Sequence, residues 1–413
     1  MFKYMISRRV ALFGYFLFGA ILVIANVKSG WVFISRAGFP SDNHFDDLSL
    51  VIDWSICYER IGDDVYRVQA KDSCGGYLYG QSLLDVFNFL KIYKSQLTGV
   101  SIFLTFASLL TVVTVAEKSR NSSISSLLVI GALIFSPNYF LLLERMNVDI
   151  IIIILLIVAA LVLKSNKFPV AFGLLAATAL FKFYTFPLLI FASIKYSIGK
   201  SRIFALLIST VVAIKIFTDF QKIEALFPST WFISFGMQIW GKYLSLLTET
   251  FGLNRTNFNW SIATLFGIIL LLLTVLAIRL AEHFLNRTGK SVSDLNQVDK
   301  EDLPLFEFLA IPYLTCYFIN MSYDYRLPLM SLAMCVVLKY QSGVRYRIYT
   351  GLTLMATWMT VFIPFPASNS VVTLWQLIGD LAMLPLVIAL LLLLVKSSGN
   401  QRTFQLKGLI GWN

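Results

Sequence analysis

The chain has 413 residues, of which 57% are hydrophobic and 14% are charged, and its formal net charge is +11. A soluble domain carries about 25% charged residues, so the composition excludes an ordinary soluble protein and indicates a polytopic membrane protein. In a soluble protein the basic excess would suggest nucleic-acid binding. Here basic residues that collect on the cytoplasmic side and hold the topology explain it, and no nucleic-acid partner is expected.

Apolar stretches along the whole chain predict an all-α membrane protein with about 12 transmembrane helices, which form a single polytopic domain. The first stretch is longer than the apolar region of a signal peptide and lacks a clear cleavage site, so we predict a retained first span. The predicted spans cover residues 10–27, 96–116, 125–143, 149–163, 169–181, 186–198, 203–218, 259–281, 304–320, 327–340, 347–364 and 372–395.

This topology puts both termini on one side of the membrane. Basic residues are in excess there, so that side is predicted to be cytoplasmic, in a bacterial plasma membrane. The large segments 28–95 and 219–258 then form extracytoplasmic loops. The linker 282–303 and the tail 396–413 are predicted to lie in the cytoplasm.

Several segments differ from plain spans. Apolar residues recur at near-helical spacing in Phe45–Ile61, and Tyr79–Tyr93 looks similar, so we predict two helices that lie flat on the membrane surface. Residues 169–181 and 186–198 are shorter than the roughly 20 residues of a full span. They predict a hairpin that meets at Lys182 and forms a cavity wall, because irregular backbone at that depth needs protein or water around it.

Cysteine and histidine usage limits the possible sites. Cys57 and Cys74 share the first extracytoplasmic loop, and the sequence leaves open whether they form a disulfide. The other two cysteines fall in predicted spans, where burial as small hydrophobes is expected. No Cys or His spacing suggests zinc, and the chain has only 2 histidines, so neither a metal site nor a cofactor is expected.

Four polar clusters lie on the extracytoplasmic side in this topology. A single charge at the end of a span is readily explained as snorkelling. Four clusters on one face are harder to dismiss, because ionisable groups near the membrane interior are costly and tend to be functional. The clusters are Asp42/Asp46/Asp47/Asp53, Glu144 to Asp149, Lys182, and Tyr323 to Arg326.

These residue types suit the transfer of a sugar from a polyprenyl phosphate to a lipid or glycan acceptor at the membrane surface. Asp46 or Asp47 would take a proton from the acceptor hydroxyl. Cations would stabilise the departing phosphate, and arginine suits paired phosphate oxygens. The candidate cations are Arg145, Lys182 and Arg326. The candidates for orienting these groups or contacting the sugar are Glu144, Asn147, Asp149, Asp324, Tyr77, Tyr79, Tyr184 and Tyr323.

Four short motifs resemble the GT-C superfamily of polyprenyl-phosphate-sugar glycosyltransferases, and within it glycosyltransferase family 87. They are Asp47 followed by Gly62-Asp63-Asp64-Val65-Tyr66, the segment Glu144-Arg145-Met146-Asn147-Val148-Asp149, the element from Lys182 to Pro187, and Tyr323-Asp324-Tyr325-Arg326-Leu327.

The resemblance implies an inverting, metal-independent transferase whose site lies on the extracytoplasmic face. It also implies that the aspartate of the first loop is the base, and the spacing to Gly62 favours Asp47 over Asp46. The chain departs from the family pattern in two places. Gly76 to Gln81 replaces an Asn-Tyr-Pro type element, and two extra residues precede Pro187.

Two other functions fit the same composition. A transporter or flippase of a lipid-linked or anionic solute would line a path with these charges, although transporters often show matching broken spans in both halves. An enzyme like the O-antigen polymerases would instead depend on Lys222, Lys242 and Arg255. Within the spans, Glu307 is explained by the helix N-terminus nearby, whereas Asp380 has no explanation from the sequence.

Overall fold

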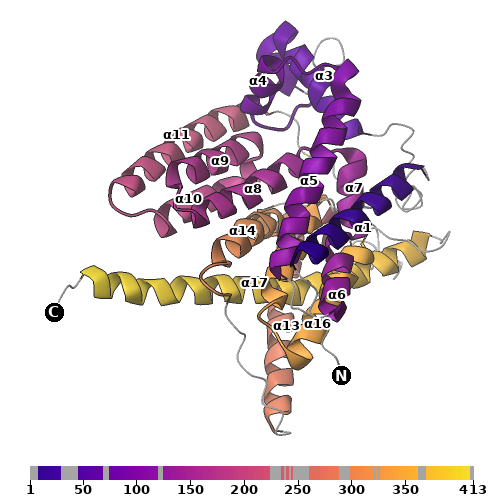
Figure 1. Ribbon diagram of the computed structural model, residues 1–413, viewed down its shortest axis with the longest axis vertical. Coiled ribbons are helices and arrows are strands. Elements are labelled where there is room, and N and C mark those ends of the chain that lie inside the picture. Colours follow the sequence, from indigo (N-terminus) through magenta and orange to yellow (C-terminus); the bar gives the residue numbers. More distant parts are fainter. Residues whose placement is uncertain are drawn as a thin grey trace.

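The structure, a computed structural model, describes residues 8–28, 45–67, 74–119, 124–223, 234–236, 239–240, 243–244, 260–287, 298–319, 322–323, 326–360 and 369–409. Helices make up nearly all of it (Figure 1). They are α1 (Arg8–Lys28), α3 (Asp46–Ile61), α4 (Gln81–Phe89), α5 (Leu97–Ser119), α6 (Ile124–Ile134), α7 (Pro137–Arg145), α8 (Asp149–Lys164), α9 (Phe168–Phe181), α10 (Phe186–Lys195), α11 (Lys200–Lys222), α13 (Trp260–Arg287), α14 (Leu303–Ile319), α15 (Leu327–Leu338), α16 (Gly343–Trp358) and α17 (Asn369–Leu409).

Short 3-10 turns and one pair of strands complete the described elements. The turns are η1 (Gly62–Tyr66), η3 (Lys94–Gln96) and η4 (Phe183–Thr185). Strands β1 (Ser234–Phe235) and β2 (Ser322–Tyr323) pair antiparallel. This pairing places part of the predicted second loop beside the segment that precedes α15.

The all-helical architecture is confirmed, and each of the twelve predicted spans contains helix. Four helical stretches in the described ranges are long and apolar enough to cross a membrane, which indicates a membrane protein. Twelve crossings are not shown, because the other apolar helical stretches found in those ranges cover only 10–17 residues. The four stretches are Lys94–Ser119, Ser125–Arg145, Ser201–Lys222 and Leu374–Ser397.

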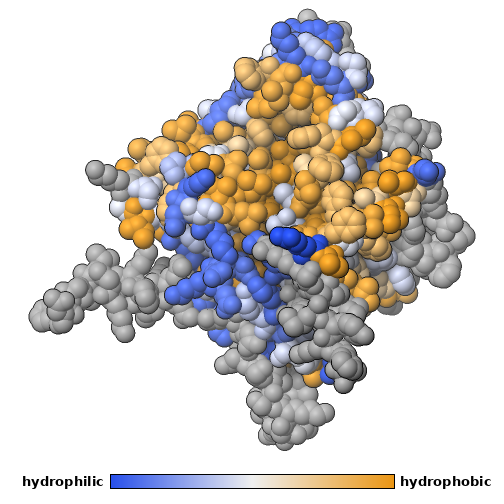
Figure 2. Space-filling view, in the orientation of Figure 1, coloured by the Kyte–Doolittle hydropathy of each residue, from blue (hydrophilic) through white to orange (hydrophobic). Residues whose placement is uncertain are grey.

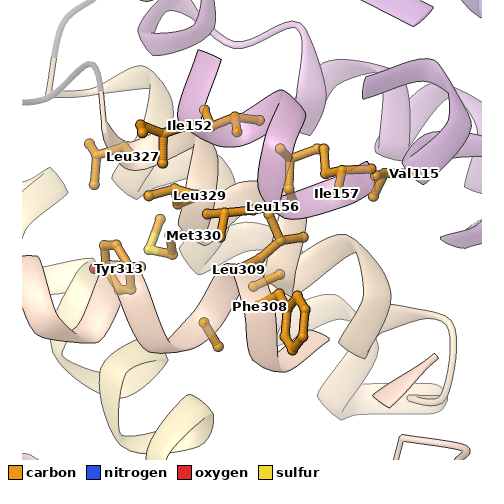
Figure 3. Close-up of a cluster of buried hydrophobic side chains, with 14 of the residues drawn as sticks. Val115, Ile152, Leu156, Ile157, Phe308, Leu309, Tyr313, Leu327, Leu329 and Met330 are labelled. Carbon is orange, nitrogen blue, oxygen red and sulfur yellow. The ribbon is translucent and has the colours of Figure 1, made fainter. Parts of the chain in front are cut away.

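The centre of the molecule is an apolar core between α5, α8, α14 and α15 (Figure 3). Every residue of α15 is buried, which agrees with its being apolar on all sides. Leu156 of α8 and Leu309 of α14 lie with Met330 of α15 in this core. Because α8 and α15 are fixed here, their first residues are held at one end of the bundle.

A broad exposed apolar surface lies along the bundle. Figure 2 shows it between a hydrophilic region over α3 and α4 and a second hydrophilic region lower in the view. Soluble proteins rarely expose apolar patches of this extent, whereas a lipid-facing surface does. On α5 and α11 it includes Ile102, Phe103, Phe106, Ile203, Phe204, Leu207, Val211, Ile214, Phe217 and Phe220.

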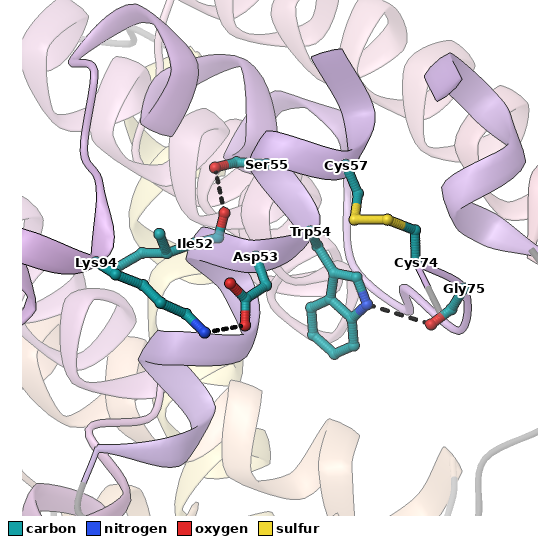
Figure 4. The surroundings of a disulfide bond; sticks show 8 residues. All are labelled: Ile52, Asp53, Trp54, Ser55, Cys57, Cys74, Gly75 and Lys94. Atoms are coloured by element: carbon teal, nitrogen blue, oxygen red, sulfur yellow. Dashed lines mark hydrogen bonds and ion pairs between the residues drawn. A yellow bond between two sulfur atoms is a disulfide. The ribbon is translucent and has the colours of Figure 1, made fainter. Parts of the chain in front are cut away.

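Residues 45–67 and 74–93 form a small unit, the cap, at one end of the bundle (Figure 1). The cap has its own core, which includes Val65, Tyr66, Tyr77 and Leu84. A disulfide joins Cys57 of α3 to Cys74, and Trp54 Nε1 donates to the carbonyl oxygen of Gly75 at 3.2 Å (Figure 4). The covalent bond therefore ties α3 to the segment that leads into α4.

The structure changes the interpretation of the predicted surface helices. Both exist, but the apolar face of α3 is buried in protein rather than open to lipid, since Leu48, Val51 and Ile52 join the main core. Two predicted boundaries also differ. Residues 125–143 are divided into α6 and α7 at Pro137, and α17 continues to Leu409, through much of the predicted tail.

Two acids within predicted spans have partners that the sequence did not indicate. Glu307 is fully buried, and its carboxylate accepts hydrogen bonds from Lys195, Tyr196 and Ser397. An ion pair, rather than the start of α14, therefore explains its position. Asp380 of α17 accepts a hydrogen bond of 2.5 Å from the Tyr243 hydroxyl.

Candidate functional site

The start of α3 lies against the turn between α7 and α8. The backbone N–H of Phe45 donates to the carbonyl oxygen of Glu144 at 2.9 Å. Because α3 begins one residue later, Asp46 and Asp47 lie beside this turn.

Asp47 is held by two side chains from the turn. Its Oδ1 accepts from Arg145 Nε at 3.1 Å and Nη2 at 2.6 Å, and its Oδ2 accepts from Asn147 Nδ2 at 2.6 Å. The carboxylate of Asp46 is 3.6 Å from Arg145 Nη1 and more exposed, at 31% against 14% for Asp47. Asp47 is thus oriented by hydrogen bonds, and Asp46 interacts with the same guanidinium more weakly.

The turn itself is built by Met146 and Asn147. Met146 ends α7 in the left-handed conformation, with φ of 47°. Asn147 Oδ1 then accepts from the backbone N–H of Asp149 at 3.0 Å, so one asparagine side chain both supports the start of α8 and contacts Asp47. Glu144 is buried on the same turn.

Asp149 is the carboxylate at the centre of a second set of contacts. It is fully buried at the first position of α8, where a negative charge is favourable. Its Oδ2 accepts from Arg326 Nε at 2.9 Å, and its Oδ1 accepts from the Tyr184 hydroxyl at 2.9 Å. Lys182 Nζ lies 3.5 Å from Oδ1, so two cations share one carboxylate.

Lys182 lies between α9 and η4, and its side chain is 2% exposed. The contact with Asp149 is longer than a hydrogen bond, and Lys182 Nζ has no hydrogen-bond acceptor among the described residues. It lies instead over the ring of Tyr79, 3.5 Å from the centroid. Because an ammonium carries three donors, this site has donor capacity that a ligand could use.

Tyr79 connects the cap to this network. Burial and the negative charges of Asp47 and Asp149 raise the pKa of its hydroxyl above the ordinary value, so the hydroxyl stays protonated near neutral pH. Tyr77, proposed as a sugar contact, is instead a fully buried residue of the cap core between the rings of Trp54 and Tyr66.

The structure therefore brings together residues from five separate segments. Tyr184, considered from the sequence as a sugar contact, donates its hydroxyl hydrogen bond to Asp149. Asp53 lies elsewhere and pairs with Lys94. Tyr323 is described only as part of β2, and Asp42 and Asp324 lie outside the described residues. The residues of the network are Asp46, Asp47, Tyr79, Arg145, Asn147, Asp149, Lys182, Tyr184 and Arg326.

The charges in this network balance, because Asp46, Asp47 and Asp149 face Arg145, Lys182 and Arg326. In the described ranges no cluster of three or more His, Cys, Asp and Glu residues could hold a metal ion. Comparison of the chain with protein-family models, curated proteins and solved structures finds no match.

Proposed function

We propose that the chain is an integral-membrane glycosyltransferase that moves a sugar from a polyprenyl-phosphate donor to a lipid or glycan acceptor. The observation that carries this proposal is the buried Lys182 ammonium, which makes no hydrogen bond of ordinary length among the described residues and lies 3.5 Å from the Asp149 carboxylate, in the same network as Asp47. A cation and a carboxylate side by side suit phosphate departure and proton removal in one step.

Lys182 and Arg326 are the proposed contacts for the donor phosphate. Both already form ion pairs with Asp149, which keeps the two cations close together in the absence of a ligand. A bound phosphate would therefore interact with cations whose charge Asp149 partly neutralises. Arg145, bound to Asp47, would add its charge at the edge of the same network.

Asp47 is the proposed base, and its Oδ2 is the reacting atom. A carboxylate offers about four lone-pair directions, two on each oxygen. Oδ1 of Asp47 already accepts two hydrogen bonds from Arg145, whereas Oδ2 accepts one from Asn147. Oδ2 therefore keeps a direction for the acceptor hydroxyl. Asp46 is the alternative base on the same face.

The proposed topology has the cap outside the membrane and both termini in the cytoplasm, in a bacterial plasma membrane. The Cys57–Cys74 disulfide supports this orientation, because disulfides persist in oxidising compartments. The apolar surface between the two hydrophilic ends supports a membrane around the bundle (Figure 2). The transferase site would then lie at the extracytoplasmic surface, within reach of a lipid-anchored donor.

Sugar transfer from a panel of radiolabelled polyprenyl-phosphate sugars, measured in membranes, tests the proposal. We expect wild-type protein to use at least one donor. We expect Asp47→Asn to lower the rate by about 100-fold or more, because it removes the general base. Asp46→Asn should have a smaller effect. Asp63→Asn is the matched control, since Asp63 lies in the cap and pairs with Lys222.

Two outcomes would contradict parts of this assignment. Equal losses in the Asp46 and Asp47 variants would mean that Asp47 is not the sole base. No transfer from any donor by correctly inserted protein, together with movement of an intact lipid-linked sugar across vesicles, would favour the transporter instead.

A further inference from the structure

The ring of Tyr79, a residue of the cap, lies against the Lys182 ammonium. The ring centroid is 3.5 Å from Nζ, and Asp149 lies 3.5 Å from the same atom. With the side chain of Lys182 only 2% exposed, a ligand cannot reach the ammonium while the ring stays in place. Tyr79 itself is only partly buried.

The main chain next to Tyr79 is fixed on the end of α9. The Gly80 N–H donates to the Phe181 carbonyl at 3.4 Å, and the Tyr77 hydroxyl donates to the Gly80 carbonyl at 2.9 Å. A Cβ on residue 80 would lie 1.7 Å from the Leu180 carbonyl oxygen, which only glycine avoids. The backbone of this segment therefore lies directly on the residues that precede Lys182.

A carboxylate from α11 holds the following residue. The Gln81 N–H is at the start of α4 and donates to Asp219 Oδ2 at 3.0 Å. Lys215 Nζ donates to Asp219 Oδ1 and to Gln81 Oε1, both at 2.8 Å. Gly80 precedes α4 and has no side chain to accept a hydrogen bond from the first turn of the helix. The buried carboxylate of Asp219, on α11, accepts that hydrogen bond in its place. We call Asp219, Lys215 and Gln81 the clamp.

We propose that the Tyr79 ring is a gate over the Lys182 ammonium, and that the clamp holds the main chain so that only the ring has to turn. The gate excludes water and solutes from the ammonium until an anion displaces the ring. A phosphate oxygen can replace it because it offers a full charge and a hydrogen-bond acceptor, whereas the ring offers only its π face. The identity of that anion as a lipid-linked phosphate rests on the proposed function.

Amine labelling of the full-length protein in detergent tests the gate without an activity assay. Reductive methylation is quantified by mass spectrometry at Lys182 and at Lys94, an exposed internal reference at 59%. We expect slow labelling of Lys182 in the wild type. Tyr79→Leu, which keeps bulk but loses the π face, and Tyr79→Ala should label Lys182 roughly ten-fold faster or more.

Three further variants separate the parts of the proposal. Tyr79→Phe keeps the ring over the ammonium and should label like the wild type. Asp219→Ala releases the start of α4 and should also speed labelling. Asp64→Asn changes an exposed cap carboxylate that pairs with Arg67, and should leave labelling unchanged. Thermal melting of each variant confirms that it is folded.

Slow labelling of Lys182 in folded Tyr79→Ala and Tyr79→Leu would overturn the gate. Wild-type labelling in Asp219→Ala would overturn the role of the clamp. Farnesyl phosphate is added as the probe in a second series, and protection of Lys182 in Tyr79→Ala supports a phosphate site. Fast labelling of Lys182 in Tyr79→Ala that farnesyl phosphate does not slow would support the gate and contradict the phosphate site. Failure of the gate and failure of the phosphate assignment therefore give different results.

Discussion

At the scale of single residues, two fully buried carboxylates are paired with cations. Asp149 faces Arg326 and Lys182 at one end of the bundle, and Glu307 faces Lys195 in a separate pair. Buried ion pairs do not necessarily add stability compared with apolar residues, but the removal of one partner is costly. The two clusters differ in how fully their charged groups are hydrogen-bonded. Glu307 accepts from three donors, whereas the Lys182 ammonium lacks a hydrogen-bond acceptor among the described residues.

Glu307→Ala should therefore destabilise the protein strongly. It leaves Lys195, with 7% of its side chain exposed, without a carboxylate, which costs roughly 3–5 kcal/mol. The double variant Lys195→Met/Glu307→Met should recover most of the loss, because it removes both charges and keeps the volume. The temperature at which half of the protein aggregates in detergent measures the stability of the single and the double variant. Equal losses in the single and double variants would argue against the charge as the cause.

At the scale of elements, the cap is a small helical unit, and among the described residues its backbone N–H groups bond to the bundle at three places. The start of α3 bonds to Glu144, Gly80 bonds to Phe181, and the start of α4 bonds to Asp219. Glu144 and Phe181 each directly precede a residue of the network, and Asp219 belongs to the clamp. Because the apolar core of the cap is small, we expect the Cys57–Cys74 disulfide to supply much of the free energy that holds α3 and α4 together.

Replacement of Cys57 and Cys74 by serine should loosen the cap selectively. The bond closes a segment of 17 residues, for which a disulfide contributes about 3 kcal/mol. Hydrogen exchange in the cap should therefore become up to about 100-fold faster, while exchange in α8 and α15 stays unchanged. Mass spectrometry of amide exchange measures this. A uniform increase in all helices would show that the bond stabilises the whole bundle instead.

At the scale of the whole molecule, an exposed apolar surface separates the hydrophilic region over the cap from a second hydrophilic region lower in the view (Figure 2). A membrane that covers this surface would place the cap on one side and the start of α14 on the other. Asp64 in the cap and Glu301 before α14 are well exposed, at 50% and 79%. With the membrane placed in this way, labels at Asp64 and Glu301 would report on opposite sides of the membrane.

A membrane-impermeant maleimide should label Asp64→Cys in intact cells and Glu301→Cys only after permeabilisation. The cysteines of the disulfide and the two free cysteines are buried, so the new thiols should dominate the signal. The wild type serves as the control for background labelling. Labelling of both variants in intact cells would contradict a cap and an α14 start on opposite sides.

The helical, membrane-type architecture follows from composition and hydropathy, because long apolar stretches leave a chain few alternatives to helices in lipid. The sequence also indicated Asp47, Arg145, Asp149, Lys182 and Arg326 as residues of interest, since charges at the ends of apolar stretches are costly. The number of crossings depended on helix lengths that only the structure could show, and four helical stretches in the described ranges are long and apolar enough to cross a membrane.

The tertiary structure alone decided which of these charges meet. Asp149 and Arg326 are separated by 177 positions, and Gln81 and Asp219 by 138, so no local spacing could pair them. The same holds for the Tyr79 ring over Lys182 and for the disulfide, which the sequence left open. The physical reason is that contacts between distant segments depend on how whole helices pack, whereas helix formation depends on neighbours a few residues apart.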